Sequence, residues 1–475
     1  MQETNGIRRS AVTILSLFAP LFVSQCAQMA NAVIDTAMAG GLGTPELGAV
    51  CVGSALWTPV FTFVAGLLHG LLVLVARSHG AARREEVLRL GWDGLWAGLA
   101  LGTAAALCVY ACVFDFSWLE TDPELREHAR RYLLALLPGI PFAGLALSVR
   151  FFLEGQSITK PVTVCSIIAI GINATLNYGL MFGQLGMPCL GLAGCGAATA
   201  ASMVSGFVML TAYSILSPHL ASRRLPVRLC LPSWGTLKMI LRIGLPVGIA
   251  IGLECHVFAA ITYFVSRSGP AAAAAHQTAV SCTMFCLTAP AALSMAASIR
   301  ISTLRGRNDL EEAFRTAKAV IVLASGLGLL SGLCLSAIPG QVILFFSSDP
   351  DVTPLATALI RIAGLFQILM AIQVCLNGIL RGLGDTVFPF MATSAVYWMF
   401  CLPLGYLLSG MPLPFGSGVY AGALGIAGWW AAFALSLILV TGLLAYRARK
   451  QFHPCSAMLD PARLEHERES RAILP

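Results

Sequence analysis

The first residues in this sequence whose type and spacing could do chemistry lie inside an apolar stretch. The segment Pro20 to Gly41 reads PLFVSQCAQMANAVIDTAMAGG and contains Gln25, Gln28, Asn31 and Asp35. Their spacing places these polar side chains on one face of a helix. An aspartate at the centre of a membrane helix costs roughly 2.5 to 3.5 kcal/mol on insertion scales, so we expect Asp35 to face a bundle interior or a watery cavity. A solvated position at the outer end of the helix is the alternative.

A second carboxylate, Glu254, lies near the middle of another apolar stretch, within GLECHVFAA. Removal from water penalises the charged form of a carboxylate, so such a group can take up a proton on one side of a membrane and release it on the other. It can also give oxygen ligands to a small hard cation. A neutral glutamic acid hydrogen-bonded within a bundle is the structural alternative. Asp35 and Glu254 are the only acidic residues that we expect inside long apolar helices.

Two asparagines on a third apolar stretch are candidate partners for Asp35. Asn173 and Asn177 stand four residues apart in GINATLNYG, which places both amides on one helix face. They could hold a neutral or cation-bound Asp35. They could also join helices, through hydrogen bonds worth about 0.6 kcal/mol each.

No other pattern indicates catalysis. The histidines of the apolar stretches, His69, His256 and His276, are expected to be packed or solvated, and His256 should point away from the neighbouring Glu254. The sequence has no metal-ligand spacing, no nucleotide-binding loop and no nucleophile elbow. It therefore argues against an enzyme, and we expect no cofactor.

The composition is that of an integral membrane protein. The chain has 475 residues, of which 57% are hydrophobic and 11% charged, whereas soluble domains average about 25% charged residues. The net charge of +7 does not indicate nucleic acid, because the basic residues form short clusters between apolar stretches. Most of the 15 cysteines lie within those stretches and are interpreted as small buried hydrophobes. A disulfide between Cys189 and Cys195 is left open.

The apolar stretches predict an all-α integral membrane fold with twelve transmembrane helices. They cover residues 11–38, 46–76, 91–114, 132–153, 160–183, 190–215, 238–266, 271–299, 316–338, 354–380, 386–410 and 420–446. The first stretch is too long, and too polar on one face, for a cleavable signal peptide. Lysine and arginine concentrate before it and in every second loop, which places both termini in the cytoplasm. The segment 115–131 is amphipathic, and we expect it to lie along the outer membrane surface.

The chain also repeats itself. Matching positions recur at nearly constant spacing, as in Pro20 and Pro246, Gly43 and Gly269, Gly80 and Gly306, EGQSIT at 154–159 and RGLGDT at 381–386, and GLAGCGAA at 191–198 and GIAGWWAA at 425–432. The repeat predicts two pseudo-symmetric six-helix lobes, 1–225 and 226–450, followed by a cytoplasmic tail, 451–475. Lobes of this kind enclose a central cavity, which is typical of transporters.

Several of these segments together resemble the multidrug and toxic-compound extrusion (MATE) transporters, and most closely their NorM-type branch. The segments are PLFVSQCAQMANAVIDTAMAGGLG, GINATLNYGLMFG with GLAGCGAATAAS, GLPVGIAIGLECHVFAA, AAAAHQTAV and LNGILRGLGDTVFP. The resemblance runs from about residue 10 to 446. It implies alternating access between two lobes, with organic cations expelled in exchange for Na⁺ or H⁺.

The resemblance also implies roles for individual residues. Asp35 matches the first-helix aspartate of the N-lobe cation site, with Asn173 and Asn177 as its fifth-helix partners. Pro20 matches the proline at which the first helix bends, and Glu254 matches the seventh-helix glutamate of the C-lobe.

The chain departs from the family at one position of the C-lobe. Where NorM-type members often have an aspartate in helix 10, this chain reads LMAIQV, with Met370 at the matching position. Glu254 would thus lack its usual second carboxylate. A proton needs one carboxylate, whereas Na⁺ needs several converging oxygens, so this departure favours H⁺ coupling.

We therefore hypothesise an antiporter in a bacterial inner membrane that expels amphipathic organic cations. Asp35, with Glu254 as a second candidate, would bind H⁺ or Na⁺, and the substrate would occupy a cavity lined by methionine and aromatic side chains. The lipid bilayer and the small cationic substrate are the expected partners, and we expect a monomer. Cavity residues are Gln25, Gln28, Asn31 and Met370.

Two other classes of function remain alternatives. A lipid-linked oligosaccharide flippase of the same superfamily would line its cavity with several basic residues, and the membrane spans of this chain offer only Arg150 near the end of the fourth. The other alternative is a membrane-embedded enzyme or receptor; an enzyme should show catalytic residues converging on a loop, and the sequence shows none.

Overall fold

The computed structural model describes residues 2–116, 122–217, 231–344, 352–410 and 424–452. Within these ranges, twelve helices are long and apolar enough to cross a membrane, as the sequence predicts. The fourth consists of α4 and α5 joined by a 3₁₀ turn, Leu137–Gly139, and the eleventh consists of α13 and α14 joined by a π-helical turn, Val396–Cys401.

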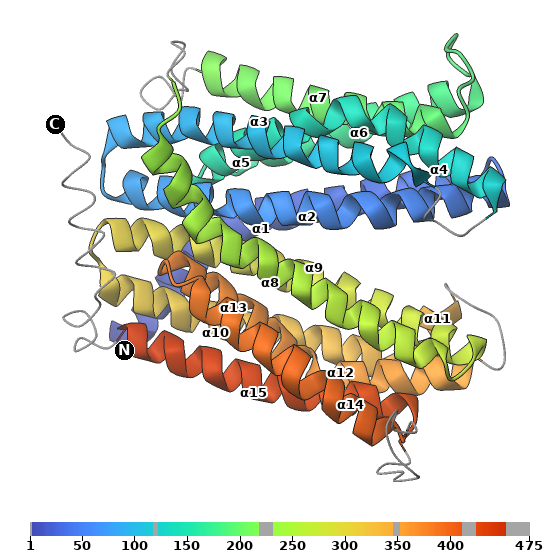
Figure 1. The fold of residues 1–475 in the computed structure, drawn as a ribbon. Coiled ribbons are helices and arrows are strands. Elements are labelled where there is room, and N and C mark those ends of the chain that lie inside the picture. Colours follow the sequence, from blue (N-terminus) through green and yellow to red (C-terminus); the bar gives the residue numbers. More distant parts are fainter. Residues whose placement is uncertain (1, 117–121, 218–230, 345–351, 411–423, 453–475) are drawn as a thin grey trace.

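The helices fall into an N-lobe and a C-lobe, which lie one above the other in Figure 1. The N-lobe contains α1 (Gln2–Gly40), α2 (Thr44–Gly80), α3 (Arg84–Phe114), α4 (Pro123–Leu136), α5 (Ile140–Gly155), α6 (Lys160–Phe182) and α7 (Leu192–Leu216). The C-lobe contains α8 (Trp234–Ser266), α9 (Pro270–Gly306), α10 (Leu310–Ala337), α11 (Pro339–Leu344), α12 (Val352–Gly382), α13 (Val387–Ala395), α14 (Leu402–Ser409) and α15 (Ile426–Phe452).

The backbone follows the sequence repeat. Residues with positive φ occur at matching helix ends of the two lobes: Ala82 (57°) and Asn308 (59°), Ser157 (65°) and Gly384 (80°), Gly183 (68°) and Gly410 (72°), and Gly191 (56°) and Gly425 (53°). In the first three pairs, a left-handed residue after a helix lets the chain reverse while the last carbonyls of the helix stay hydrogen-bonded. The two lobes therefore use the same turns at the same places, which confirms the pseudo-symmetric fold.

Two helices belong partly to each lobe. On α1, Ile14 packs in the core of the C-lobe, whereas Leu21 packs in the core of the N-lobe. On α8 the order is reversed, with Ile240 in the N-lobe core and Val257 in the C-lobe core. The first helix of each lobe is thus anchored at its beginning in the opposite lobe.

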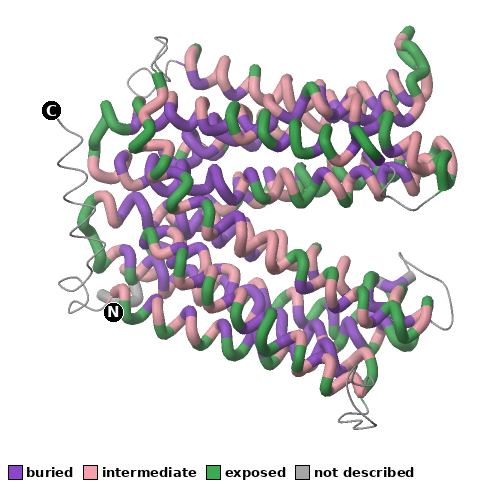
Figure 2. The backbone as a smooth tube through the Cα atoms, in the orientation of Figure 1, coloured by how far each residue is buried: buried purple, intermediate pink, exposed green. Residues whose placement is uncertain are grey.

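The lobes meet backbone to backbone along the second half of α2. Every residue from Gly66 to Ala76 is buried, and Figure 2 shows buried residues concentrated along this part of the helix. A Cβ atom on Gly244 of α8 would lie 1.8 Å from the Leu67 carbonyl oxygen, and one on Gly80 would lie 1.9 Å from the Thr303 carbonyl oxygen of α9. Small residues allow helices to approach this closely in membranes. Toward the opposite ends of these helices, the ribbons of the two lobes diverge (Figure 1).

The structure bears on one expectation and one open question about the outer segments. Residues Pro123–Leu136, which include part of the expected surface segment, form a helix continuous with the fourth span; Asp122 caps it, and its Oδ1 accepts a hydrogen bond of 3.0 Å from the Glu124 amide. Residues 117–121 lie outside the described residues. Cys189 and Cys195 are both free thiols, so they form no disulfide. The predicted lobe boundary at 225 and most of the predicted tail, 453–475, also lie outside the described residues.

Candidate functional site

Asp35 lies inside the N-lobe, near the end of α1, and is 8% exposed. Asn177 of α6 donates a hydrogen bond from Nδ2 to Asp35 Oδ1 at 2.6 Å. Thr199 of α7 donates from Oγ1 to Asp35 Oδ2 at 3.3 Å. Both carboxylate oxygens therefore have a partner from a neighbouring helix, and the side chain is not solvated at the end of its span.

The predicted asparagine pair completes a closed ring of hydrogen bonds with Asp35. Asn177 Nδ2 also donates to Asn173 Oδ1 at 3.0 Å, and Asn173 Nδ2 donates to Thr199 Oγ1 at 3.4 Å. Both asparagines are fully buried. Asn177 Oδ1 is buried without a partner among the described residues. The ring thus leaves one free amide oxygen, on Asn177. This oxygen can accept a hydrogen bond from a protonated carboxyl group or bind a cation.

Thr199 is the site residue that sequence reasoning missed. It stands in the alanine-rich segment GCGAATAAS, where a single hydroxyl gives no periodic signal. Its Oγ1 also lies 3.0 Å from the Cys195 carbonyl oxygen, the usual partner of a helical threonine one turn back. Only its distance from Asp35 across the lobe, which the sequence does not contain, distinguishes it from a packing residue.

The rest of the polar face of α1 is less buried than Asp35. Gln28 is exposed and donates from Nε2 to Gln25 Oε1 at 3.3 Å, and Gln25 is half-buried. Asn31 is half-buried, and its Oδ1 is enclosed without a partner among the described residues. The face therefore grades from an accessible end at Gln28 to a closed end at Asp35.

Pro20 lies on α1 just after the helix enters the N-lobe core, which contains Leu17 and Leu21. Thr163 of α6 donates from Oγ1 to the Pro20 carbonyl oxygen at 2.7 Å, and Ser24 Oγ donates to Thr163 Oγ1 at 3.3 Å. The proline ring removes the backbone hydrogen bond that residue 20 would donate to the Ser16 carbonyl oxygen. Thr163 attaches this turn to the N-lobe through the Pro20 carbonyl oxygen.

Glu254 occupies the middle of α8 in the C-lobe and is half-buried. The groups that interact with it electrostatically are Gln373 and Arg381 of α12 and Tyr397 of the π-helical turn. The nitrogen of Gln373, Nε2, has no hydrogen-bond partner among the described residues. Glu254 thus faces an amide and a cation rather than a second carboxylate.

Met370, one turn before Gln373, is 4% exposed and packs in the C-lobe core. The structure therefore shows no open surface on this predicted cavity residue. His276 is packed, as expected, since its Nδ1 accepts from Trp430 Nε1 at 3.2 Å. His256 is exposed, and its Nδ1 lies 2.7 Å from the Gly252 carbonyl oxygen of its own helix.

Besides Asp35 and Glu254, two acidic residues at the ends of the predicted spans are buried. Asp93 of α3 is buried, and its Oδ1 accepts from the Ser233 amide at 2.8 Å. Glu154 of α5 is fully buried and pairs with Arg150, with 2.7 Å between Oε1 and Nε. Both stand near helix ends, where neighbouring elements cover them. Their partners are structural, and no cluster of three or more metal-ligating His, Cys, Asp or Glu side chains occurs in the described ranges.

Two repeated helical lobes, with carboxylates held on their first helices, define the architecture of a secondary transporter. Comparison with known proteins agrees with this class. The profile of the MatE family matches residues 20–179 and 246–407. The chain is 31% identical over 442 residues to multidrug resistance protein MdtK of Edwardsiella ictaluri (strain 93-146), covering 93% of this chain and 95% of that protein. It is 33% identical over 436 residues to MdtK of Proteus mirabilis (strain HI4320), covering 90% and 93%.

Solved structures share the fold. A multidrug resistance MATE family transporter of the MOP superfamily in an outward-facing conformation superposes with a TM-score of 0.84 at 19% identity, over 95% of this chain and 97% of that one. The eukaryotic MATE transporter AtDTX14 gives a TM-score of 0.81 at 20% identity, over 94% and 98%. The chain therefore belongs to the MATE family. It is a multi-pass membrane transporter and not an enzyme.

Proposed function

We propose that this protein is a multidrug efflux antiporter that expels amphipathic organic cations in exchange for H⁺ or Na⁺. The observation that carries the proposal is the carboxylate of Asp35, enclosed in the N-lobe within a ring of neutral hydrogen-bonding groups. A carboxylate in such a place favours binding of one positive charge, because an unpaired negative charge inside the membrane is unfavourable in free energy. The relatives named for multidrug resistance support the choice of substrate class.

The arrangement of the lobes supports an alternating-access cycle. The lobes are packed together at the ends of α2 and α9, where the basic loops occur, and their ribbons diverge at the other end (Figure 1). With both termini in the cytoplasm, this state opens to the outside. Uptake of a coupling cation at Asp35 from outside would then discharge the site, and an organic cation would be released because two positive charges do not share it.

The donor set at Asp35 supports H⁺ more than Na⁺ as the coupling ion. A nitrogen donor and a hydroxyl donor already occupy the two carboxylate oxygens. Besides Asn31 Oδ1, one turn earlier on α1, the oxygen near the site without a partner among the described residues is Asn177 Oδ1. A proton would need only that acceptor, after rotation of the Asn177 amide. Na⁺ would need several oxygens to converge in place of those donors. Asp35 and Glu254 remain the two places where a cation would bind.

The charged residues of the membrane spans do not support the flippase alternative. Arg150, the basic residue that could have indicated a phosphate site, is neutralised by Glu154 within the same helix.

We further propose that the protein works as a monomer in the inner membrane, since each monomer contains both lobes.

The test is ethidium efflux from proteoliposomes, with a pH gradient and a Na⁺ gradient imposed separately. Asp35→Asn keeps the shape and removes the charge, so we expect exchange to be abolished while the protein remains folded in the membrane. Glu85→Gln, which removes a carboxylate from the exposed start of α3 outside the site, serves as the matched control. Normal efflux by Asp35→Asn would refute the role of Asp35, and efflux driven only by Na⁺ would refute H⁺ coupling.

A further inference from the structure

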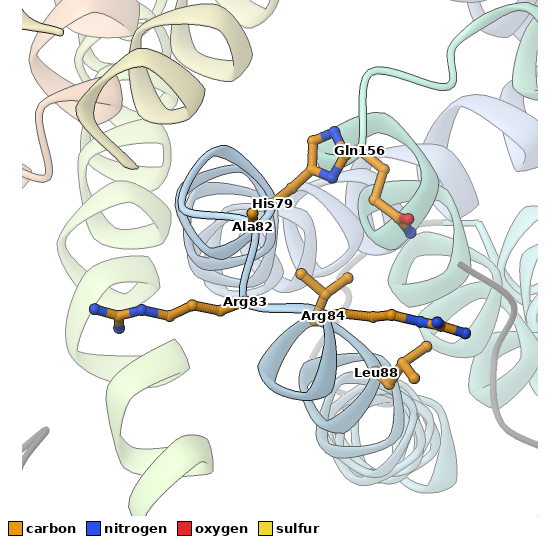
Figure 3. A pocket seen from close by; sticks show the side chains of 7 residues that line it. His79, Ala82, Arg83, Arg84, Leu88 and Gln156 are labelled. Carbon is orange, nitrogen blue, oxygen red and sulfur yellow. The ribbon is translucent and has the colours of Figure 1, made fainter. Parts of the chain in front are cut away.

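A cavity of about 200 Å³ lies outside the transport site, at the end of the N-lobe where α2 turns into α3. Figure 3 shows the side chains of His79, Arg84, Leu88 and Gln156 around it, with Arg83 extending to the other side. Drug-sized ligands need about 300 Å³ or more. The cavity is therefore too small for the transported cations and suits a smaller polar group.

Gln156 gives this cavity an acceptor without a donor. The residue follows α5 and is 2% exposed. Its Nε2 donates to the Phe152 carbonyl oxygen at 3.2 Å, which fixes the orientation of the amide. Its Oε1 is buried without a partner among the described residues. A buried acceptor without a donor lowers the stability of the fold until an N–H or O–H group binds it. We therefore expect a ligand of this cavity to carry a hydrogen-bond donor.

Arg84 gives the same cavity a cation without an anion. It forms no ion pair with any described residue, whereas Arg83 beside it pairs with Glu86 at 3.4 Å between Nη1 and Oε2. Arginine binds phosphate through several parallel N–H donors. The ligand that satisfies the cavity therefore carries a phosphate and a hydrogen-bond donor a few bonds apart.

The repeat shows that the fold does not require these polar groups. The C-lobe has Leu310 in the position of Arg84 and Leu383 in the position of Gln156, at turns with the same backbone conformation. The same helix ends therefore form with apolar residues. Arg84 and Gln156 are an addition of the N-lobe alone.

We propose that this cavity binds a phospholipid head group from the cytoplasmic leaflet whose ammonium carries at least one N–H beside the phosphate. The phosphate contacts Arg84, and the ammonium donates to Gln156 Oε1. The choice of leaflet depends on the orientation proposed above, in which this end of the helices meets the cytoplasmic membrane surface. The site lies on α2 and α3, whose ends move with the N-lobe, so an occupied site fastens this lobe to the lipid surface.

The test uses native mass spectrometry of the purified protein with phosphatidylethanolamine and phosphatidylcholine of identical acyl chains. Phosphatidylcholine has no N–H group, so we expect the wild type to retain phosphatidylethanolamine about tenfold better, the effect of one hydrogen bond to a charged donor. Successive N-methylation of the lipid should reduce retention only at the last step, which removes the last N–H. Equal retention of the two lipids would overturn the proposal.

Matched variants assign the two contacts. Arg84→Gln should lower retention of both lipids about tenfold, and Arg83→Gln should leave it unchanged. Gln156→Leu, which introduces the residue of the C-lobe, should abolish the preference between lipids. Equal effects of the two arginine variants would overturn the phosphate contact. If free phosphoethanolamine displaces the lipid at equal concentration, the site takes a soluble phosphate ester and the lipid assignment is wrong. None of these readouts requires transport, so they stand or fall separately from the antiport proposal.

Discussion

Gly244 on α8 controls how closely the two lobes approach at the closed end of the molecule. A Cβ atom there would lie 1.8 Å from the Leu67 carbonyl oxygen, whereas ordinary contact begins at 3.4 Å, so Gly244→Ala must separate α2 and α8 by about 1.6 Å. The obstacle is backbone on both sides, so no side chain can rotate to relieve it. Overpacking of this kind costs about 1 to 3 kcal/mol. The population of the present arrangement should fall about 5- to 150-fold relative to arrangements that lack this contact.

The assay is a distance measurement between spin labels at Glu85 and Glu311, which are exposed and occupy matching positions at the ends of the two lobes. The labels should be attached through unnatural amino acids, because the chain has 15 cysteines. Gly244→Ala should shift the distribution to longer distances. Gly252→Ala on the same helix is the control, since its Cβ would meet no atom within 4 Å. Indistinguishable distributions for the two variants would refute the claim that this contact holds the lobes together.

Two further variants test the site and the C-lobe. Thr199→Val keeps the shape and removes one donor to Asp35, so ethidium efflux should fall about tenfold, the effect of one hydrogen bond to a charged group; efflux equal to wild type would reduce Thr199 to a packing residue. Arg447→Gln removes the partner of Asp385, whose Oδ2 lies 2.6 Å from Arg447 Nε, and should lower the stability in detergent by about 1 to 2 kcal/mol. The exposed Arg83–Glu86 pair should contribute less than about 1 kcal/mol when Arg83 is replaced in the same way.

The twelve spans and the repeat could be predicted because both are local or periodic properties of the sequence. Apolar runs of helical length mark the spans, and recurrent residues such as Gly43 and Gly269 mark the repeat. The proximity of Asn177 to Asp35 was predictable for a different reason: both are polar side chains on apolar helices, which have few partners to choose from.

The burial of side chains by distant parts of the chain could not be predicted in the same way. Asp93 and Glu154 stand near helix ends, where sequence suggests solvent, and only the packing of α8 and the position of Arg150 show that they are enclosed. The charges of residues 115–131 gave no sign that the helix of the fourth span begins as early as Pro123. The 3₁₀ turn Leu137–Gly139 lets the chain continue, so one span contains both α4 and α5.

The two helices that begin in one lobe and end in the other explain why prolines recur in them. On α1, Ser10 Oγ donates to Glu312 Oε1 of the C-lobe at 2.9 Å, whereas Asp35 is held in the N-lobe, and Pro20 lies between these anchors. On α8, Pro246 likewise lies between Ile240 in the N-lobe core and Val257 in the C-lobe core. Any rotation of one lobe against the other must therefore bend both helices between their anchors. A proline bends at low cost because the hydrogen bond that would resist bending is already absent. The carboxylates Asp35 and Glu254 follow these prolines on the same helices, so a change of charge at either site acts on a helix that spans both lobes.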